Sequence, residues 1–195
     1  PGADTKATIT FGSCAKLATQ PVFDALTIVD PDLFLFIGDN HYANSEDLES
    51  LRWFYRWSRA MDARRTFIQH TPVLATWDDH DFTGNNTDGT NPNKDIALRA
   101  FKEYWANPSY GTSEIPGVFY QTSWGDVDLF MLDDRYYRGL GSGMLGDSQA
   151  NWLKQQLSAS TATFKLLITG SQWTTEGTSD SWKMFPEAKN TLFQY

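Results

Sequence analysis

Residues 77–86 carry a dense set of groups that can bind metals or move protons. These ten residues include three carboxylates, one imidazole and two carboxamides. Asp79 and Asn86 offer only oxygen atoms, which are the ligands that calcium and magnesium prefer. His80 lies between two carboxylates and has the chemistry to donate a proton to a leaving oxygen or to bind a phosphoryl oxygen. The segment therefore predicts a cation site with a catalytic histidine beside it.

The same Asp- and Asn-rich segment has a simpler interpretation as a capping loop. Such side chains often bond to nearby backbone and stabilise helix ends and turns. We expect this capping role for Asp78 and Asp81 rather than metal ligation. For Asp79 and Asn86 both roles stay open. His41, in an earlier segment, is expected to point away from the site because side chains alternate in direction along a strand.

A second set of candidate ligands consists of Cys14, Asp39 and Tyr42. A carboxylate and a phenol three residues apart converge on one ion if the chain turns directly after a strand. A thiolate favours a transition metal over calcium or magnesium, and a phenol loses its proton at neutral pH only beside a strong Lewis acid. The three residues together indicate ferric iron (Fe3+) more than zinc, whereas Cys14 taken alone is more typical of an inert buried thiol. If Asp39 bridges this site and the one at Asp79, two metals would hold a water between them and clamp a phosphate.

Arg135 is a further candidate for contact with a phosphate. It follows an apolar segment that ends at Leu132, and a guanidinium group at the end of a strand can grip a phosphate through two parallel hydrogen bonds. The same side chain can instead form a salt bridge with Asp133 or Asp134. The sequence leaves these two roles open.

Three apolar segments lead directly into the polar clusters. They span residues 7–12, 33–37 and 72–76, and the second is apolar throughout, as expected for a strand that is covered on both faces. In α/β sheets, ligands bind beyond the carboxyl ends of the strands. The segments therefore predict three strands of an α/β fold whose carboxyl ends carry the candidate ligands.

The other elements follow from spacing and turn residues. Helices are predicted over about residues 20–29, 44–62, 94–107 and 147–157, with another that begins near Pro186. Strands are predicted over residues 118–124, 127–132 and 164–169, and Gly125-Asp126 between the first two predicts a hairpin. The second helix and the residues after it form the basic part of the chain, where we expect a solvated face: Arg52, Arg56, Arg59, Arg64 and Arg65.

Composition excludes several classes of protein. A chain of 195 residues can bury a substantial core as one domain or a large part of one, and an aromatic content of 15% excludes a disordered chain. The formal net charge of −8 disfavours non-specific nucleic-acid binding, which needs a basic surface. The single cysteine excludes an intrachain disulfide, and no apolar stretch of about 18 residues indicates a transmembrane helix.

Five segments together resemble the PhoD-like metallophosphatases, the alkaline phosphatase D family. They occur in the order of the family and cover nearly the whole chain, which makes the set far more specific than any one segment. The segments are Phe11-Gly12-Ser13-Cys14, Gly38-Asp39-Asn40-His41-Tyr42, Trp77-Asp78-Asp79-His80-Asp81, Leu132-Asp133-Asp134-Arg135-Tyr136-Tyr137-Arg138, and Leu145-Gly146 followed by Gln149, Trp152 and Leu153.

The resemblance implies a metallophosphoesterase-like α/β/β/α sandwich, with two mixed sheets flanked by helices, in a single domain over residues 1–195. It implies metal-dependent hydrolysis of phosphomonoesters or phosphodiesters by a metal-bound hydroxide. It also implies iron and calcium as cofactors and a secreted or periplasmic location. By motif position, Cys14, Asp39 and Tyr42 resemble iron ligands, and Asp79 and Asn86 resemble calcium ligands.

His80 matches the histidine in the Asn-His-Asp/Glu block of the wider superfamily, and Asp79 stands where those enzymes carry Asn. We expect His80 and Arg135 to stabilise charge or assist the leaving group. Family members continue with another strand and a Gly-Asp-x-His segment that supplies late ligands, and no histidine follows His80 in this chain. We therefore expect a fragment, a site completed by a second chain or a C-terminal segment, or an incomplete site. The alternatives are a non-catalytic metal- or phosphate-binding relative and a structural calcium-binding domain.

Overall fold

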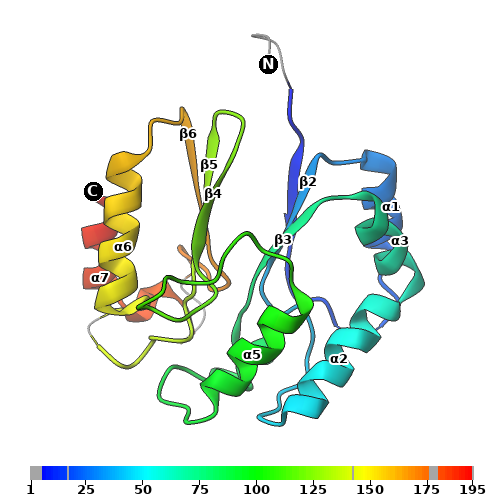
Figure 1. The fold of residues 1–195 in the computed structure, drawn as a ribbon, viewed down its shortest axis with the longest axis horizontal. Coiled ribbons are helices and arrows are strands. Elements are labelled where there is room, and N and C mark those ends of the chain that lie inside the picture. Colours follow the sequence, from blue (N-terminus) through cyan, green and yellow to red (C-terminus); the bar gives the residue numbers. More distant parts are fainter. Residues whose placement is uncertain (1–5, 17, 142, 176–179, 195) are drawn as a thin grey trace.

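Two three-stranded sheets lie face to face, with helices on their outer faces (Figure 1). The computed structural model describes residues 6–16, 18–141, 143–175 and 180–194. This arrangement confirms the predicted α/β/β/α sandwich. In this described part, no helix is both long and apolar enough to cross a membrane.

The first sheet is parallel and has the order β1-β2-β3. Helices cover its outer face, on the right of Figure 1. Its strands and the helices beside it are β1 (Ile9–Gly12), α1 (Val22–Val29), β2 (Leu33–Ile37), α2 (Leu48–Ala60), α3 (Asp62–His70), β3 (Val73–Thr76) and α5 (Lys94–Tyr104). A short helix, α4 (Asp79–Phe82), directly follows β3 at the segment that carries the candidate ligands.

The second sheet is mixed and has the order β4-β5-β6. The predicted hairpin is confirmed, because β4 pairs antiparallel with β5 across Gly125 and Asp126, whereas β6 runs parallel to β5. The elements are β4 (Tyr120–Trp124), β5 (Val127–Met131), α6 (Gly146–Ala159), β6 (Phe164–Ile168), a 3-10 turn at Trp182–Met184 and α7 (Pro186–Phe193). Helices α6 and α7 cover the outer face of this sheet (Figure 1).

The central strand of the first sheet shows how the layers are held together. Side chains alternate in direction along β2, so its two faces enter different cores. Leu33 and Leu35 pack against residues of the second sheet, in the core between the sheets. Phe34 and Phe36 pack instead under the helices. A strand that is apolar on both faces, as predicted for residues 33–37, therefore serves two cores at once.

The predicted helix over residues 44–62 is wrong in its extent. Two helices occupy this region, because Met61 adopts extended backbone angles (φ −64°, ψ 125°) and separates α2 from α3. The first helix begins after Asp47, whose carboxylate accepts a hydrogen bond from the Ser50 amide at 2.7 Å. The expected solvated arginine face is also wrong in part, because α3 turns Arg64 inward, where it is 1% exposed.

Candidate metal centre

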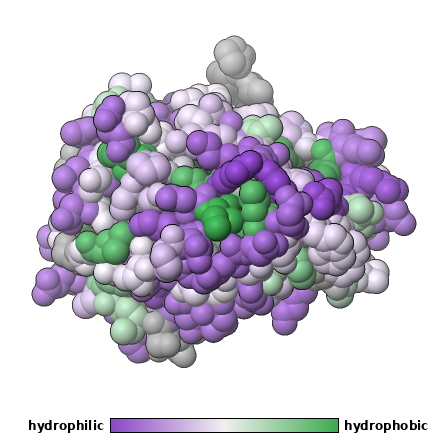
Figure 2. Space-filling view, turned by 60° about the horizontal axis from the view of Figure 1, so that its bottom comes forward, coloured by the Kyte–Doolittle hydropathy of each residue, from purple (hydrophilic) through white to green (hydrophobic). Residues whose placement is uncertain are grey.

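The candidate ligands gather at the carboxyl ends of β1, β2 and β3. Each strand ends a few residues before one of them, and parallel strands bring these ends to one edge of the sheet. A cavity of about 410 Å³ opens there. Figure 2 turns this end of the molecule forward, and hydrophilic side chains cover most of the face. The cavity is lined by Ser13, Cys14, Gly38, Asp39, Asp78, Asp79, His80, Asn85, Asn86, Gly170, Gln172 and Asp180.

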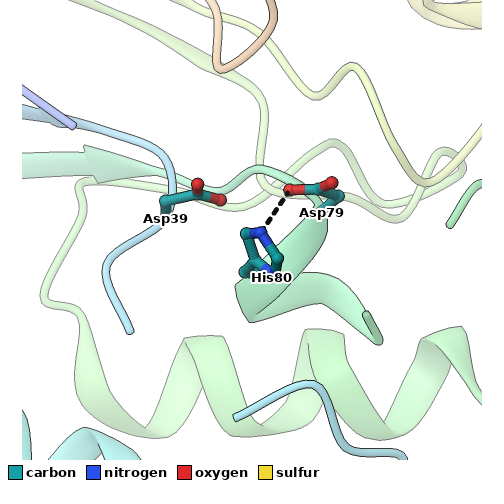
Figure 3. Close-up of side chains that lie close together, drawn as sticks. All are labelled: Asp39, Asp79 and His80. Carbon is teal, nitrogen blue, oxygen red and sulfur yellow. Dashed lines mark ion pairs between the residues drawn. The ribbon is translucent and has the colours of Figure 1, made fainter. Parts of the chain in front are cut away.

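Asp39, Asp79 and His80 form the tightest cluster (Figure 3). Each offers one ligand atom, and the three atoms lie within 4.8 Å of one another. Asp39 is 7% exposed and Asp79 is 6% exposed. In the described part of the chain, Asp39 Oδ1 is buried without a hydrogen-bond partner. A buried carboxylate with a free oxygen is costly unless a cation completes its coordination, so the cluster fits a metal ion.

Cys14 and Tyr42 both reach the other oxygen of Asp39. The Tyr42 hydroxyl donates to Asp39 Oδ2 at 2.9 Å, and the Cys14 thiol donates to the same atom at 3.6 Å. Burial raises the pKa of Asp39, the Tyr42 hydrogen bond opposes this, and the charge of Asp79 adds to it. Burial, with hydrogen bonds to Cys14 and Asp39, also raises the pKa of Tyr42. The side chains of Cys14 and Tyr42 thus converge on Asp39 Oδ2, and the ligation of a metal by these three residues stays a prediction.

His80 is held from two sides. Its Nδ1 lies 2.5 Å from Asn44 Oδ1, and its ring lies against the ring of Tyr42 with 4.2 Å between centroids. Its Nε2 lies 4.0 Å from Asp79 Oδ1. The sequence placed Asn44 at the start of a helix, but Asp47 is the cap and Asn44 instead orients His80. No sequence signal connects these residues, since 36 positions separate Asn44 from His80.

The short helix α4 fixes the direction of the segment that carries the candidate ligands Asp79 and Asn86. The Asp78 amide donates to Asp81 Oδ1 at 2.7 Å, in the pattern of a capping box, which confirms the expected capping role. Asp81 Oδ2 accepts from the Asn40 amide at 3.1 Å and so ties this helix to the end of β2. Asn86 returns to the site through its backbone, and its amide donates to Asp79 Oδ2 at 2.7 Å.

Three candidate ligands, together with Asn44, adopt left-handed backbone angles. Only five described residues other than glycine have positive φ, and four of them are Cys14 (59°), Asp39 (52°), Asn44 (47°) and Asn86 (57°). Non-glycine residues in this region carry strain, which is typical of functional sites. Gly38 (φ 99°) directly precedes Asp39, and a Cβ there would lie 2.7 Å from the Asp78 Cβ. Such close packing requires glycine at this position.

Arg135 lies under the site with its guanidinium group fully engaged. Nε donates to Asp78 Oδ1 and Nη2 donates to Asp180 Oδ2, each at 2.6 Å, and Nη2 also reaches Ser171 Oγ at 3.2 Å. The side chain is 0% exposed. Burial lowers the pKa of Arg135, but the charges of Asp78 and Asp134, together with the hydrogen bond to Asp180, outweigh burial and raise it. The salt bridge with Asp133 or Asp134, one of the two roles that the sequence left open, does not form among the described residues, and the ion pairs of Arg135 are with Asp78 and Asp180.

The two aspartates before Arg135 have structural roles. Trp77 Nε1 donates to Asp133 Oδ1 at 2.7 Å, which joins the two sheets beside the site. Asp134 Oδ2 accepts from the Thr169 hydroxyl and from the Ser171 amide, both at 2.6 Å. The sequence gives no signal for a role of Ser171 or Asp180, because the segment after β6 contains no recognisable ligand spacing.

Comparison with known proteins identifies the family. The model of the family described as PhoD-like phosphatase matches residues 9–194. The chain belongs to the PhoD-like phosphatase family. The chain is similar to a solved structure described as "Structure of PhoD", with a TM-score of 0.83 and 20% identity, over 100% of this chain and 49% of that one. A search of curated proteins finds no match.

A second solved structure resembles this PhoD-like chain more distantly. It is the purple acid phosphatase PPD1 from yellow lupin (Lupinus luteus) seeds, with a TM-score of 0.65 and 12% identity, over 96% of this chain and 35% of that one. The PhoD-like chain thus spans about half the length of the PhoD structure and about a third of the lupin enzyme. These likenesses show the metallophosphoesterase fold, and the acidic cluster provides a place for a metal.

Proposed function

We propose that this chain provides the metal centre of a phosphatase that hydrolyses phosphomonoesters or phosphodiesters. The observation that carries the proposal is the pair of buried carboxylates, Asp39 and Asp79, at the strand ends of a PhoD-like domain, with His80 beside them as a hydrogen-bond donor rather than a ligand. The buried, unpartnered oxygen of Asp39 supports a bound cation, because burial without a partner is otherwise costly.

The donor atoms differ between the two sides of Asp39. Cys14 and Tyr42 offer sulfur and phenolic oxygen, which suit ferric iron, whereas Asp79 and Asn86 offer oxygen atoms, which suit calcium. We propose that Asp39 serves both ions. When bound, the metals would lower the pKa of a water and neutralise the charge of the phosphate group.

The protein residues orient the substrate around these ions. Asn44 and Tyr42 fix the ring of His80, so that its Nε2 remains close to Asp79 and to the cavity. His80 is therefore placed to donate a hydrogen bond to a phosphoryl oxygen or a proton to the leaving oxygen. The position of Arg135 in its motif suggests a catalytic residue. Its hydrogen bond to Asp78 supports a different role, in which Arg135 holds the segment that carries Asp79 and His80 in place.

The proposal extends to the setting of the protein. The chain covers 49% of the PhoD structure, which supports further ligands from a C-terminal segment or a second chain. We propose a secreted or periplasmic location, in keeping with the family. The net charge of −8 disfavours non-specific nucleic-acid binding and is compatible with a phosphorylated ester, because bound cations would invert the local charge.

Metal analysis combined with hydrolysis assays tests the proposal. Elemental analysis and visible absorbance of the purified chain should show near-stoichiometric iron with a charge-transfer band, and calcium beside it. Hydrolysis of p-nitrophenyl phosphate and of its bis ester should accompany the metals. Asp79→Asn should lower activity by at least about 100-fold, because even an outer partner of a ligand commonly contributes 10–100-fold.

A matched control is Asp126→Asn, in the exposed turn of the β4-β5 hairpin, which should leave metal content and activity unchanged. Bound metal without hydrolysis of either ester would favour a non-catalytic relative. Calcium without iron would favour a structural calcium-binding domain. Full activity in Asp79→Asn would show that the cluster is not the reaction centre.

A further inference from the structure

A group of buried hydrogen-bond donors lies behind the metal centre, between the first sheet and its helices. In the described part of the chain, five such atoms lack a partner: His41 Nε2, Tyr55 Oη, Arg59 Nη1, Arg64 Nε and Trp105 Nε1. Their residues come from four places, namely the turn after β2, helix α2, helix α3 and the end of α5. Buried polar groups in proteins are nearly always hydrogen-bonded, so this many unpaired atoms in one region indicates an absent ligand.

The five side chains pack around one another. The rings of His41 and Tyr55 meet edge to face with 4.2 Å between centroids. The Arg59 guanidinium lies 4.2 Å from the Trp105 ring and 5.8 Å from the Tyr55 ring. The positive charges of Arg59 and Arg64 both act on the buried Tyr55 hydroxyl. Arg64 stands over the face of Phe36, whose ring also packs against Trp105.

The two arginines have no carboxylate partner. Among the described residues, no aspartate or glutamate lies within ion-pairing distance of Arg59 or Arg64. Asp81 is the buried carboxylate nearby, but its oxygens accept from Asn40 and from the Asp78 amide. Cation–π contacts cover the faces of the guanidinium groups. Arg59 Nη2 donates to the Tyr104 carbonyl oxygen and Arg64 Nη1 to the Asn40 carbonyl oxygen, whereas Arg59 Nη1 and Arg64 Nε are unpaired. Buried cations without a counter-charge are costly.

The His41 ring contributes a donor rather than an acceptor. The Ala43 amide donates to His41 Nδ1 at 3.3 Å, which places the ring hydrogen on Nε2. The region therefore presents N–H groups of His41, Arg59, Arg64 and Trp105 together with the Tyr55 hydroxyl. Asn40 Oδ1 is the unpaired acceptor beside them. A water molecule needs acceptors for its own hydrogens, whereas an anion only accepts, so a donor-rich site favours an anion.

We propose that these residues bind a small monovalent anion, with chloride as the fitting species. The site would lie between α2, α3 and the end of β2, apart from the metal centre. The site is buried, so a bound ion must lose its hydration shell, and this loss costs less for an ion with a single charge. The packed side chains also favour a compact ion. The guanidinium groups would supply the attraction, and the Tyr55 and Trp105 donors would complete the coordination.

The proposed anion would brace the loop that carries the metal ligands. Arg64 Nη1 donates to the Asn40 carbonyl oxygen at 2.9 Å, and Asn40 and His41 lie between Asp39 and Tyr42 in the chain. An ion that holds Arg64 and His41 in place would therefore stabilise the backbone of this loop. This role does not depend on the proposed phosphatase activity, and its test measures binding and stability alone.

Thermal unfolding in sodium chloride and in sodium gluconate at equal ionic strength tests the proposal. Chloride should raise the Tm by several degrees in a saturable manner, because a ligand that binds only the folded state stabilises it. Bromide should do the same, and crystals grown in sodium bromide should show an anomalous peak among the five donors. Equal Tm values in both salts, with no bromide peak, would overturn the proposal and assign waters to this region.

Variants on one helix provide the matched control. Arg59→Met should abolish the chloride-dependent rise in Tm, while Arg56→Met, at an exposed position on the same helix α2, should retain it. Tyr55→Phe removes one donor with little change in shape, so it should weaken the dependence of the Tm on chloride. It serves as the test variant if Arg59→Met does not fold. A chloride response that survives both Arg59→Met and Tyr55→Phe would show that the ion binds elsewhere.

Discussion

Replacement of Arg135 by methionine removes the cation that two aspartates share beneath the metal centre. Met has a similar length and no charge, so it leaves Asp78 and Asp180 without their ion pairs with Arg135. The Arg135 side chain is 0% exposed and the Asp78 side chain is 16% exposed, so solvent screens this pair little. Loss of one partner from a buried pair costs about 3–5 kcal/mol. For a domain of this size, the Tm should fall by about 6–20 °C.

Urea unfolding, followed by tryptophan fluorescence, measures this loss. Arg99→Met is the matched control, because the Arg99 side chain is 64% exposed and pairs with Glu103 at the surface. We expect it to cost less than about 1 kcal/mol. The double variant Arg135→Met/Asp78→Asn should recover at least about 1 kcal/mol relative to Arg135→Met, because a neutral amide replaces the unpaired carboxylate.

Two results would refute this reasoning. If Arg135→Met costs no more than Arg99→Met, the buried network does not stabilise the fold. If the second substitution at Asp78 gives no recovery, the loss arises from packing of the arginine chain rather than from an uncompensated charge.

Two further predictions concern other charged groups. In the presence of a metal chelator, Asp39→Asn should raise the free energy of unfolding by about 1 kcal/mol, because it neutralises a buried carboxylate with an unpaired oxygen. The same substitution should abolish metal binding, as measured by elemental analysis. Glu103 lies on α5 and accepts a hydrogen bond from Arg52 on α2. This hydrogen bond is the main cause that lowers the pKa of Glu103 from 4.5 to about 2, and burial opposes it only slightly. The ionised carboxylate therefore adds stability above pH 4.5, and this stability is lost as the pH falls through about 2. Glu103→Gln should lower the Tm by about 1–2 °C at pH 7 and by less at pH 3. An equal fall in Tm at both pH values would contradict this assignment.

The elements that position the site could be predicted because their signals are local. Residues 33–37 are apolar throughout, which indicates a strand buried on both faces, and β2 occupies the same residues. Gly125 and Asp126 between two apolar segments indicate a hairpin, which β4 and β5 form. The placement of Cys14, Asp39 and Asp79 after three strands likewise predicted that they would gather at one edge of a sheet.

The break at Met61 illustrates where local patterns fail. Helical spacing continues across residues 44–62, and neither glycine nor proline interrupts it. The two helices separate because each packs in its own direction on the sheet, with Tyr55 and Phe67 both buried in the same core. Arg64 is buried for the same reason, and a charge pattern along the sequence cannot distinguish it from its exposed neighbour Arg65.

The sequence by itself determined the strands, the order of the motifs and the residue types available for metal binding, because these depend on neighbours in the chain. Only the tertiary structure decided the partners of those residues. Arg135 reaches Asp78 across 57 positions, and His80 reaches Asn44 across 36. The tertiary structure also decided that Arg64 is buried while Arg65 is exposed. Hydrogen bonds and burial depend on distances between segments far apart in the chain, and the packing of the two sheets and their helices sets those distances.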